Sequence, residues 1–272
     1  MTNQNDQKAK KGFKFNFNSA GFILLACFIV AEAIYFFIFG NPSNFVNNDP
    51  KNHALDGNLL GTIYKGGMIV PVIQTLLLTV LTLSVERFIA LKKAQGTGSL
   101  VDFAVNIKKS LAKGDLKSAR EICAAQKGSV ANVVASALDK YEQVEVDNSM
   151  SKEQKILAIQ KEIEEATALE LPMLSQNLPI VATITTLGTL MGLLGTVIGM
   201  IRSFAALSGA GGTDSLALSQ GISEALINTA FGIATGALAV ISYNFFTSKI
   251  DGLTYCIDEV GFTIVQSFAA SH

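Results

Sequence analysis

The chain has 272 residues, of which 16% are charged, and a formal net charge of −1; its mean hydropathy is +0.39. Soluble domains carry nearer a quarter charged residues, so this composition excludes an ordinary soluble globule and gives no reason to expect nucleic acid as a partner. The cysteines Cys27, Cys123 and Cys256 are widely spaced, and His53 and His272 are isolated. We therefore expect unpaired thiols, no metal site, no cofactor and no histidine-based catalysis.

Four segments are long and apolar enough to span a membrane, since a hydrocarbon core of about 30 Å needs roughly 20 apolar residues in a helix. They are 20–39, 67–90, 177–205 and 217–247. A cleaved signal peptide is the rival interpretation of the first segment. Its apolar run is longer than a usual signal core, and Gly40-Asn41-Pro42 follows it in place of an Ala-x-Ala site, which favours an uncleaved span. The fold class is therefore an all-α membrane protein with four spans.

Basic residues set the predicted topology, because cytoplasmic loops carry the excess of lysine and arginine. Four lysines precede the first span: Lys8, Lys10, Lys11 and Lys14. The predicted order is a cytoplasmic basic N-terminus at 1–19, a transmembrane helix at 20–39, a periplasmic loop at 40–66, a transmembrane helix at 67–90, a cytoplasmic helical domain at 91–176, a transmembrane helix at 177–205, a periplasmic link at 206–216, a transmembrane helix at 217–247 and a cytoplasmic helical tail at 248–272. Both termini are then cytoplasmic.

The segment 91–176 is predicted to be helical throughout, because start and stop signals divide it at helical lengths. One helix ends at Gly114, and Asp115 caps the next. Ser129 is predicted to cap a third helix. Ser151 stands three residues before Gln154, as in a capping box, and begins a fourth helix that leads towards the third span.

The tail after the last span carries an apolar stripe at intervals of three and four residues. Its members are Ile250, Leu253, Ile257, Val260, Ile264 and Phe268. A helix that is polar on one side and apolar along one seam packs against other helices, so this stripe needs a partner.

Small residues recur at spacings of four in the last two spans. They are Gly188, Gly192, Gly195, Gly199, Gly232 and Gly236. In lipid, glycines at this spacing let two helix backbones approach closely. We expect tight packing of the two helices, which is also compatible with a channel.

A sparse set of polar residues lies in the same two spans. Glu224 sits about two turns into the fourth span, with Asn228 one turn further on the same face and Thr229 beside it. A carboxylate in the membrane costs several kcal/mol unless it is protonated, paired or in contact with water. Arg202, near the outer end of the third span, either pairs with an acid or snorkels to the interface. Thr196 lies mid-span, although a threonine alone often bonds only its own helix.

Two other acids lie in or beside the predicted spans. Asp214, in the predicted link, is the alternative partner to Glu224 for Arg202. Glu32, in the first span, has no polar neighbours at helical spacing, so we expect it to have a packing or interfacial role.

Two motifs in the last two spans resemble a known family. GLLGTVIGMIRSF at 192–204, followed by GISEALINTAFGIATGALAVISYNFF at 221–246, resembles the MotA/TolQ/ExbB proton-channel family, and within it ExbB and TolQ. The likeness runs from about residue 67 to the end. It departs from the family at Gly188-Thr189, where an Ala-Pro pair is usual, and segment 1–66 lies outside the common three-span plan.

The resemblance implies a homopentamer in the bacterial inner membrane, surrounded by lipid. The last two spans would line a pore that holds the helices of an ExbD/TolR-type single-span partner. Protons would cross by way of that partner's aspartate and drive a TonB/TolA-type protein. The family's pore threonines correspond to Thr196 and Thr229, and its glutamate corresponds to Glu224. Glu224 and Thr229 are about 140° apart on a helix, so we expect Glu224 to face the seam between subunits.

The leading hypothesis is an ExbB-like proton-channel subunit of a motor, not an enzyme, that energises a TonB system for outer-membrane transport. A TolQ-like subunit and a gliding or flagellar stator subunit are the alternatives within the family. A substrate transporter predicts inverted repeats and broken helices, and neither is visible in the sequence. A purely structural scaffold would account for the glycines but not for Glu224. Threonine hydroxyls can line a path for protons or for sodium ions, so the sequence leaves both ions as alternatives.

Overall fold

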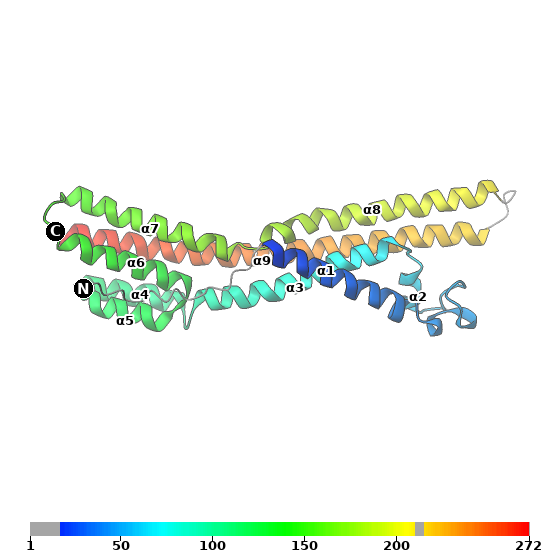
Figure 1. Ribbon diagram of the computed structural model, residues 1–272, viewed down its shortest axis with the longest axis horizontal. Helices are drawn as coiled ribbons and strands as arrows, with labels where there is room; N and C mark the ends of the chain where they lie inside the picture. Colours follow the sequence, from blue (N-terminus) through cyan, green and yellow to red (C-terminus); the bar gives the residue numbers. More distant parts are fainter. Residues whose placement is uncertain (1–16, 210–214, 272) are drawn as a thin grey trace, which may run out of the picture. The chain divides into compact units, whose positions relative to one another are not determined.

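The computed structural model describes residues 17–209 and 215–271, which are almost entirely helical (Figure 1). Within these ranges the only β pairing is a single bridge between Phe45 and Ala54. The helices are α1 (Phe17–Ala33), continued by a π-helix (Ile34–Phe39), two 3-10 turns (Pro42–Asn44 and Val46–Asn48), α2 (Leu59–Tyr64), α3 (Ile69–Gln95), α4 (Leu100–Ala112), α5 (Leu116–Gln126), α6 (Gly128–Glu145), α7 (Lys152–Leu174), α8 (Leu178–Gly209) and α9 (Ser215–Ser271). The predicted all-α class is confirmed.

Four of the described helices are long and apolar enough to cross a membrane: α1 with its π-helical continuation, α3, α8 and α9. The predicted four spans of a multi-pass membrane protein are therefore confirmed. Six residues named in the sequence analysis lie outside the described residues: Lys8, Lys10, Lys11, Lys14, Asp214 and His272.

The described chain divides into two compact units. Unit 1 contains the described residues up to Thr82 and those between Thr186 and Gly236. Unit 2 contains Leu83–Thr185 and the described residues from Ala237 onward. The long helices α3, α8 and α9 each contribute residues to both units.

In unit 1, α8 and α9 run side by side and touch through glycines (Figure 1). A Cβ added to Gly232 would lie 2.6 Å from the carbonyl oxygen of Gly188 and 2.6 Å from the Cα of Gly192. These neighbours are backbone atoms, which cannot move aside as a side chain can, so only glycine allows this approach. The structure places all six glycines of the predicted set at this contact: Gly188, Gly192, Gly195, Gly199, Gly232 and Gly236.

The N-terminal part of unit 1 is held together by aromatic and polar contacts. The rings of Tyr35 and Tyr64 stack with their centroids 4.7 Å apart, and the Tyr35 hydroxyl donates to the carbonyl oxygen of Tyr64 at 3.0 Å. The buried Asn44 donates to the carbonyl oxygens of Ile38 and Phe39 at 2.8 and 3.1 Å. These carbonyl groups lie at the end of a helix, where they have no partner within the helix, and Asn44 satisfies them. The segment between α1 and α3 is therefore a structured loop.

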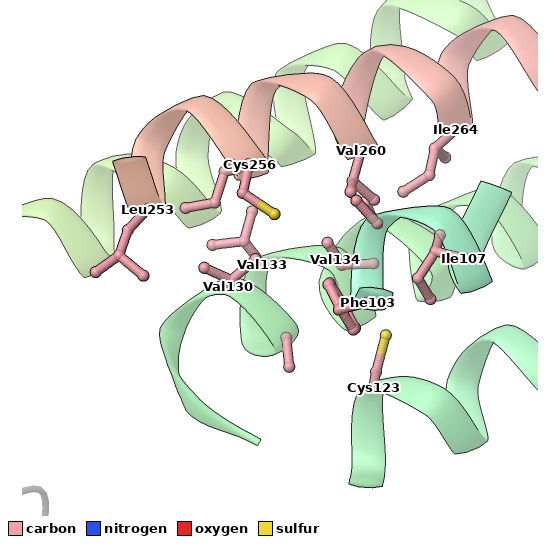
Figure 2. Packing of buried hydrophobic residues seen from close by; sticks show 14 of the residues in the cluster. Phe103, Ile107, Cys123, Val130, Val133, Val134, Leu253, Cys256, Val260 and Ile264 are labelled. Carbon is pink, nitrogen blue, oxygen red and sulfur yellow. The ribbon is translucent and has the colours of Figure 1, made fainter. Parts of the chain in front are cut away.

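Unit 2 has an apolar core made by α4, α5, α6, α7 and the last part of α9. Figure 2 shows Leu253, Cys256, Val260 and Ile264 of α9 facing the side chains of α4 and α6. The whole predicted stripe is buried, from Ile250 at 8% exposed to Phe268 at 0%. The prediction that the stripe packs against partner helices is confirmed.

The helix starts in unit 2 follow the sequence signals with one exception. Asp115 accepts from the amide of Ser118 at 2.9 Å, and Ser151 forms the predicted capping box with Gln154. The prediction that Ser129 caps a helix is wrong, since α6 begins at Gly128 and Ser129 is buried inside its first turn.

The reason for this exception is a close crossing of two chain segments. A Cβ on Gly128 would lie 2.3 Å from the carbonyl oxygen of Ala94. The preceding Lys127 has a φ of 58°, and the amide of Thr97 donates to Gln126 O at 2.6 Å. Contacts distant in sequence fix the start of α6, and they override the local preference of serine for a cap position.

Candidate ion-path site

The two threonines singled out from the sequence meet between α8 and α9 in unit 1. The hydroxyls of Thr196 and Thr229 share a hydrogen bond. Thr229 also donates to Ala225 O at 3.1 Å, and Thr196 Oγ1 lies 3.3 Å from Gly192 O. Both side chains are half-buried. Each hydroxyl has one proton to donate and two lone pairs, so the pair is satisfied within the chain and can still accept a hydrogen bond from a water or from a protonated carboxyl group.

Glu224 pairs with Arg202 across the same two helices. One guanidinium nitrogen, Nη1 of Arg202, donates to both carboxylate oxygens of Glu224, at 2.6 and 2.8 Å. The Glu224 side chain is 9% exposed and that of Arg202 is 54% exposed. The carboxylate of Glu224 is thus held by a cation of its own chain. A buried charge of this kind is retained only with its partner, because an unpaired one is strongly destabilising.

Asn228 lies on the Glu224 side of α9 and is completely buried. Its side-chain nitrogen donates to the carbonyl oxygen of Gly66 at 2.8 Å. A Cβ on Gly195 would lie 2.3 Å from the Asn228 Cβ, so the glycine of α8 makes the space that this side chain fills. The Asn228 Oδ1 accepts no hydrogen bond from the part of the chain that the structure describes.

The predicted polar set therefore forms two groups, and each contains residues of both α8 and α9. Thr196 and Thr229 make one group at the α8–α9 contact, while Glu224, Asn228 and Arg202 make the other, against the turn that precedes α3. The role of the two residues of that turn, Gly66 and Gly67, was not predicted from the sequence. The only local signal was a pair of glycines at the start of a span, which does not reveal a contact with a residue 162 positions further along the chain. Glu32 is half-buried on α1.

The three cysteines are free and buried, as expected from their spacing. In unit 2, burial raises the pKa of the Cys123 thiol to about 12, with a smaller contribution from the charge of Asp139. Burial likewise raises the pKa of Cys256 to about 11, assisted by Glu259. Both thiols are therefore protonated at neutral pH. Among the described residues, no group of three or more His, Cys, Asp and Glu side chains is arranged to hold a metal ion.

Comparison with known proteins places this site in a family. Residues 126–259 match the model of the MotA/TolQ/ExbB proton channel family. A putative biopolymer transport protein, ExbB-like 3, of Synechocystis sp. is 39% identical over 88 residues, which are 32% of this chain and 42% of that protein. The Tol-Pal system protein TolQ of Haemophilus influenzae is 36% identical over 84 residues, covering 31% of this chain and 37% of that protein.

A longer alignment joins the chain to a putative ExbB homolog of Methanothermobacter thermautotrophicus, at 26% identity over 196 residues, or 72% of this chain and 65% of that protein. The chain spans less than half the length of the first two relatives. The family match nevertheless takes in most of α8 and α9, with both threonines, Glu224 and Arg202. The chain belongs to the MotA/TolQ/ExbB proton channel family, in which its relatives carry the names ExbB and TolQ.

Proposed function

We propose that this chain is the ion-channel subunit of an ExbB-type motor in the bacterial inner membrane. The motor would use the proton-motive force to energise a TonB-type protein and, through it, transport across the outer membrane. The observation that carries the proposal is the hydroxyl pair Thr196–Thr229, placed between two apolar helices that pack through glycines. Both helices are long and apolar, so a pair of hydroxyls at a contact built from glycines marks a path for an ion or a place for a polar partner.

The proposed channel needs more than one chain. In a homopentamer, five threonine pairs would surround a central pore. A single-span protein of the ExbD or TolR type would occupy that pore and supply the carboxylate that takes up the proton. The half-buried hydroxyls support this arrangement, because they can accept a hydrogen bond from a protonated carboxyl or donate one to a carboxylate without leaving a helix carbonyl unsatisfied.

The proposed orientation places unit 2 in the cytoplasm together with both termini. Unit 2 contains Lys92 and Lys93 at the end of α3 and the lysines of α4 to α7, and positive charge favours the cytoplasmic side. The loop between α1 and α3 would then be periplasmic. A TonB- or TolA-type protein would be the partner that the motor moves.

Removing the hydroxyls tests the proposal. Thr196→Val and Thr229→Val keep the size and branching of the side chain and delete only the hydroxyl. Both variants are expected to lose energised outer-membrane uptake and proton flux in liposomes that hold the chain with its single-span partner. Assembly, followed by co-purification with that partner, is expected to be unchanged.

Thr254→Val is the matched control. Thr254 is half-buried on the same helix as Thr229 and donates to its own i−4 carbonyl at 3.1 Å, but it belongs to unit 2. It should retain uptake and flux. Wild-type transport in both Thr196→Val and Thr229→Val would disprove the assignment of this pair to the ion path.

A TolQ-like role is the second candidate, favoured by the similarity to TolQ of Haemophilus influenzae. The two roles predict different phenotypes when the chain is deleted. An ExbB-type subunit is needed for energised uptake of large solutes, whereas a TolQ-type subunit is needed for an intact outer membrane. Leakage of periplasmic proteins with normal uptake would favour the TolQ-like role.

A further inference from the structure

The segment from α1 to the turn before α3 lies outside the family-matched residues 126–259, yet it is fastened to α9. We call Phe17–Gly67 the strap. Asn228 of α9 donates to Gly66 O at 2.8 Å. One turn further along α9, Phe231 packs against the apolar cluster that Tyr35 and Ile63 of the strap form with Val70 of α3. The strap thus contacts α9 over two successive turns, on the side that carries Glu224.

Gly67 brings the strap directly onto the Glu224–Arg202 pair. Its φ is +75°, a conformation that L side chains rarely adopt. A Cβ added there would lie 2.4 Å from Glu224 Oε1 and 3.4 Å from Arg202 Nη1. Gly67 therefore lies against the carboxylate, in a place where any added side chain would collide with Glu224 Oε1.

A short series of contacts joins Gly67 to the first span. The amide of Gly67 donates to Tyr64 O at 3.2 Å, and the same oxygen accepts from the Tyr35 hydroxyl at 3.0 Å. Tyr35 lies in the π-helical continuation of α1, and its ring also stacks on Tyr64. The position of α1 is thereby transmitted to the turn that covers Glu224.

We propose that the strap is a positioning device, which holds the Glu224 carboxylate against Arg202 and shields it from water as a fixed ion pair. Gly67 and Tyr35 are the positioning residues. The extra span would then serve to fix the outer half of α9, and with it Thr229. Its effect on transport rests on the proposed channel function, but the shielding of Glu224 does not depend on transport.

The test is the rate at which dicyclohexylcarbodiimide modifies Glu224 in the purified full-length chain, measured by peptide mass spectrometry. This reagent attacks neutral, accessible carboxyl groups, so a shielded ion pair reacts slowly. In Gly67→Ala the new methyl group displaces the end of the Glu224 side chain, and labelling of Glu224 is expected to rise severalfold. Gly57→Ala is the matched control, because Gly57 lies in the same strap with a φ of +77° and has nothing within 4 Å of an added Cβ.

A second variant separates displacement of the carboxylate from general strain in the turn. Glu224→Asp shortens the side chain by one methylene and leaves space for the methyl group that Gly67→Ala adds. Gly67→Ala should therefore raise labelling strongly in the Glu224 background and little in the Glu224→Asp background. Equal increases in both backgrounds, or an equal increase in Gly57→Ala, would overturn the positioning role.

Tyr35→Phe provides a milder change in case Gly67→Ala folds poorly. It removes the hydrogen bond to Tyr64 O and keeps the ring stack, and it should raise labelling of Glu224 by less than Gly67→Ala. Wild-type labelling in both variants would disprove the strap while leaving the channel function intact. Conversely, raised labelling of Glu224 in Gly67→Ala, together with full uptake in both Thr196→Val and Thr229→Val, would support the strap and disprove the assignment of the threonine pair to the ion path.

Discussion

Arg87 of α3 donates a hydrogen bond to the carbonyl oxygen of Met173, at 3.2 Å, in the last turn of α7. The same nitrogen lies 3.4 Å from Leu174 O. The last carbonyls of a helix have no intrahelical partner and carry partial negative charge, so a cation there satisfies both needs. The side chain of Arg87 is 2% exposed and pairs with its neighbour Glu86. A buried arginine therefore ties α3 to the end of α7 within unit 2.

Replacement of Arg87 should be among the most damaging changes in unit 2. Arg87→Ala leaves Glu86 and the carbonyls of α7 without their partner, and removing one member of a buried pair costs about 3–5 kcal/mol. Arg120→Ala is the control, because Arg120 is 41% exposed and pairs with Asp139 and Glu142 at the surface, where a salt bridge contributes about 1 kcal/mol or less. Thermal unfolding in detergent, followed by circular dichroism, should separate the two. Similar unfolding temperatures would contradict the role given to Arg87.

Two glycines of α9 should respond in opposite directions to alanine. Gly232→Ala places a methyl group against backbone atoms of Gly188 and Gly192, which forces α8 and α9 apart and should destabilise unit 1 by about 1–3 kcal/mol. Gly252 has nothing within 4 Å of an added Cβ, so Gly252→Ala should stabilise the same helix by up to about 1 kcal/mol. The measurement is again the unfolding temperature. A loss of stability in both variants would mean that helix contact does not explain the glycine at 232.

The sequence predicted those features that depend on local periodicity. The stripe from Ile250 to Phe268 was foreseen because an apolar seam on a polar helix must be covered. Asp115 and Ser151 were recognised as caps because a cap involves only the next three residues. The glycine spacing of α8 and α9 predicted close packing, since in lipid few other residues allow two backbones to touch.

Features that depend on contacts between distant segments were not predictable. Ser129 does not cap α6, because Ala94, more than thirty positions earlier in the chain, lies close to Gly128 and fixes the start of the helix there. The pairing of Arg202 with Glu224 depends on how α8 packs against α9. The spacing of residues within one helix does not predict that packing. The contact of Gly67 with Glu224 joins the start of one span to another far along the chain, and no local pattern marks it.

The two cysteines of unit 2 should be unreactive in the folded chain. Only the thiolate is nucleophilic, and burial raises the pKa of Cys123 to about 12 and that of Cys256 to about 11. Iodoacetamide at neutral pH should label both only after unfolding. A cysteine introduced by Asn148→Cys, in the exposed loop before α7, should react at the rate of a free thiol. Labelling of Cys123 in the folded chain at that same rate would contradict its burial.

The same raised pKa values predict how the stability of unit 2 depends on pH. An unfolded thiol ionises at about pH 8.5, whereas the folded thiols stay neutral until pH values near 11 and 12. The two thiols therefore contribute fully to the free energy of unfolding below about pH 8.5. This contribution is lost as the pH rises towards the pKa values of the thiols in the folded state. The unfolding temperature should fall across this window. Cys123→Ala should reduce that fall, and an identical pH dependence in the variant would show that Cys123 does not contribute to it.

Removing the charge of Arg202 should destabilise the chain more than removing the charge of Glu224. The Glu224 side chain is 9% exposed, whereas that of Arg202 is 54% exposed. In Glu224→Gln, Arg202 can turn its charge to solvent, so stability should change by about 1 kcal/mol or less. In Arg202→Gln the carboxylate stays buried without its partner, at a cost of about 3–5 kcal/mol. The double variant Arg202→Gln/Glu224→Gln carries no charge at the site and should recover most of that loss. Unfolding temperatures of the three variants check the cycle, and equal destabilisation by both single changes would show that Glu224 is not the buried partner.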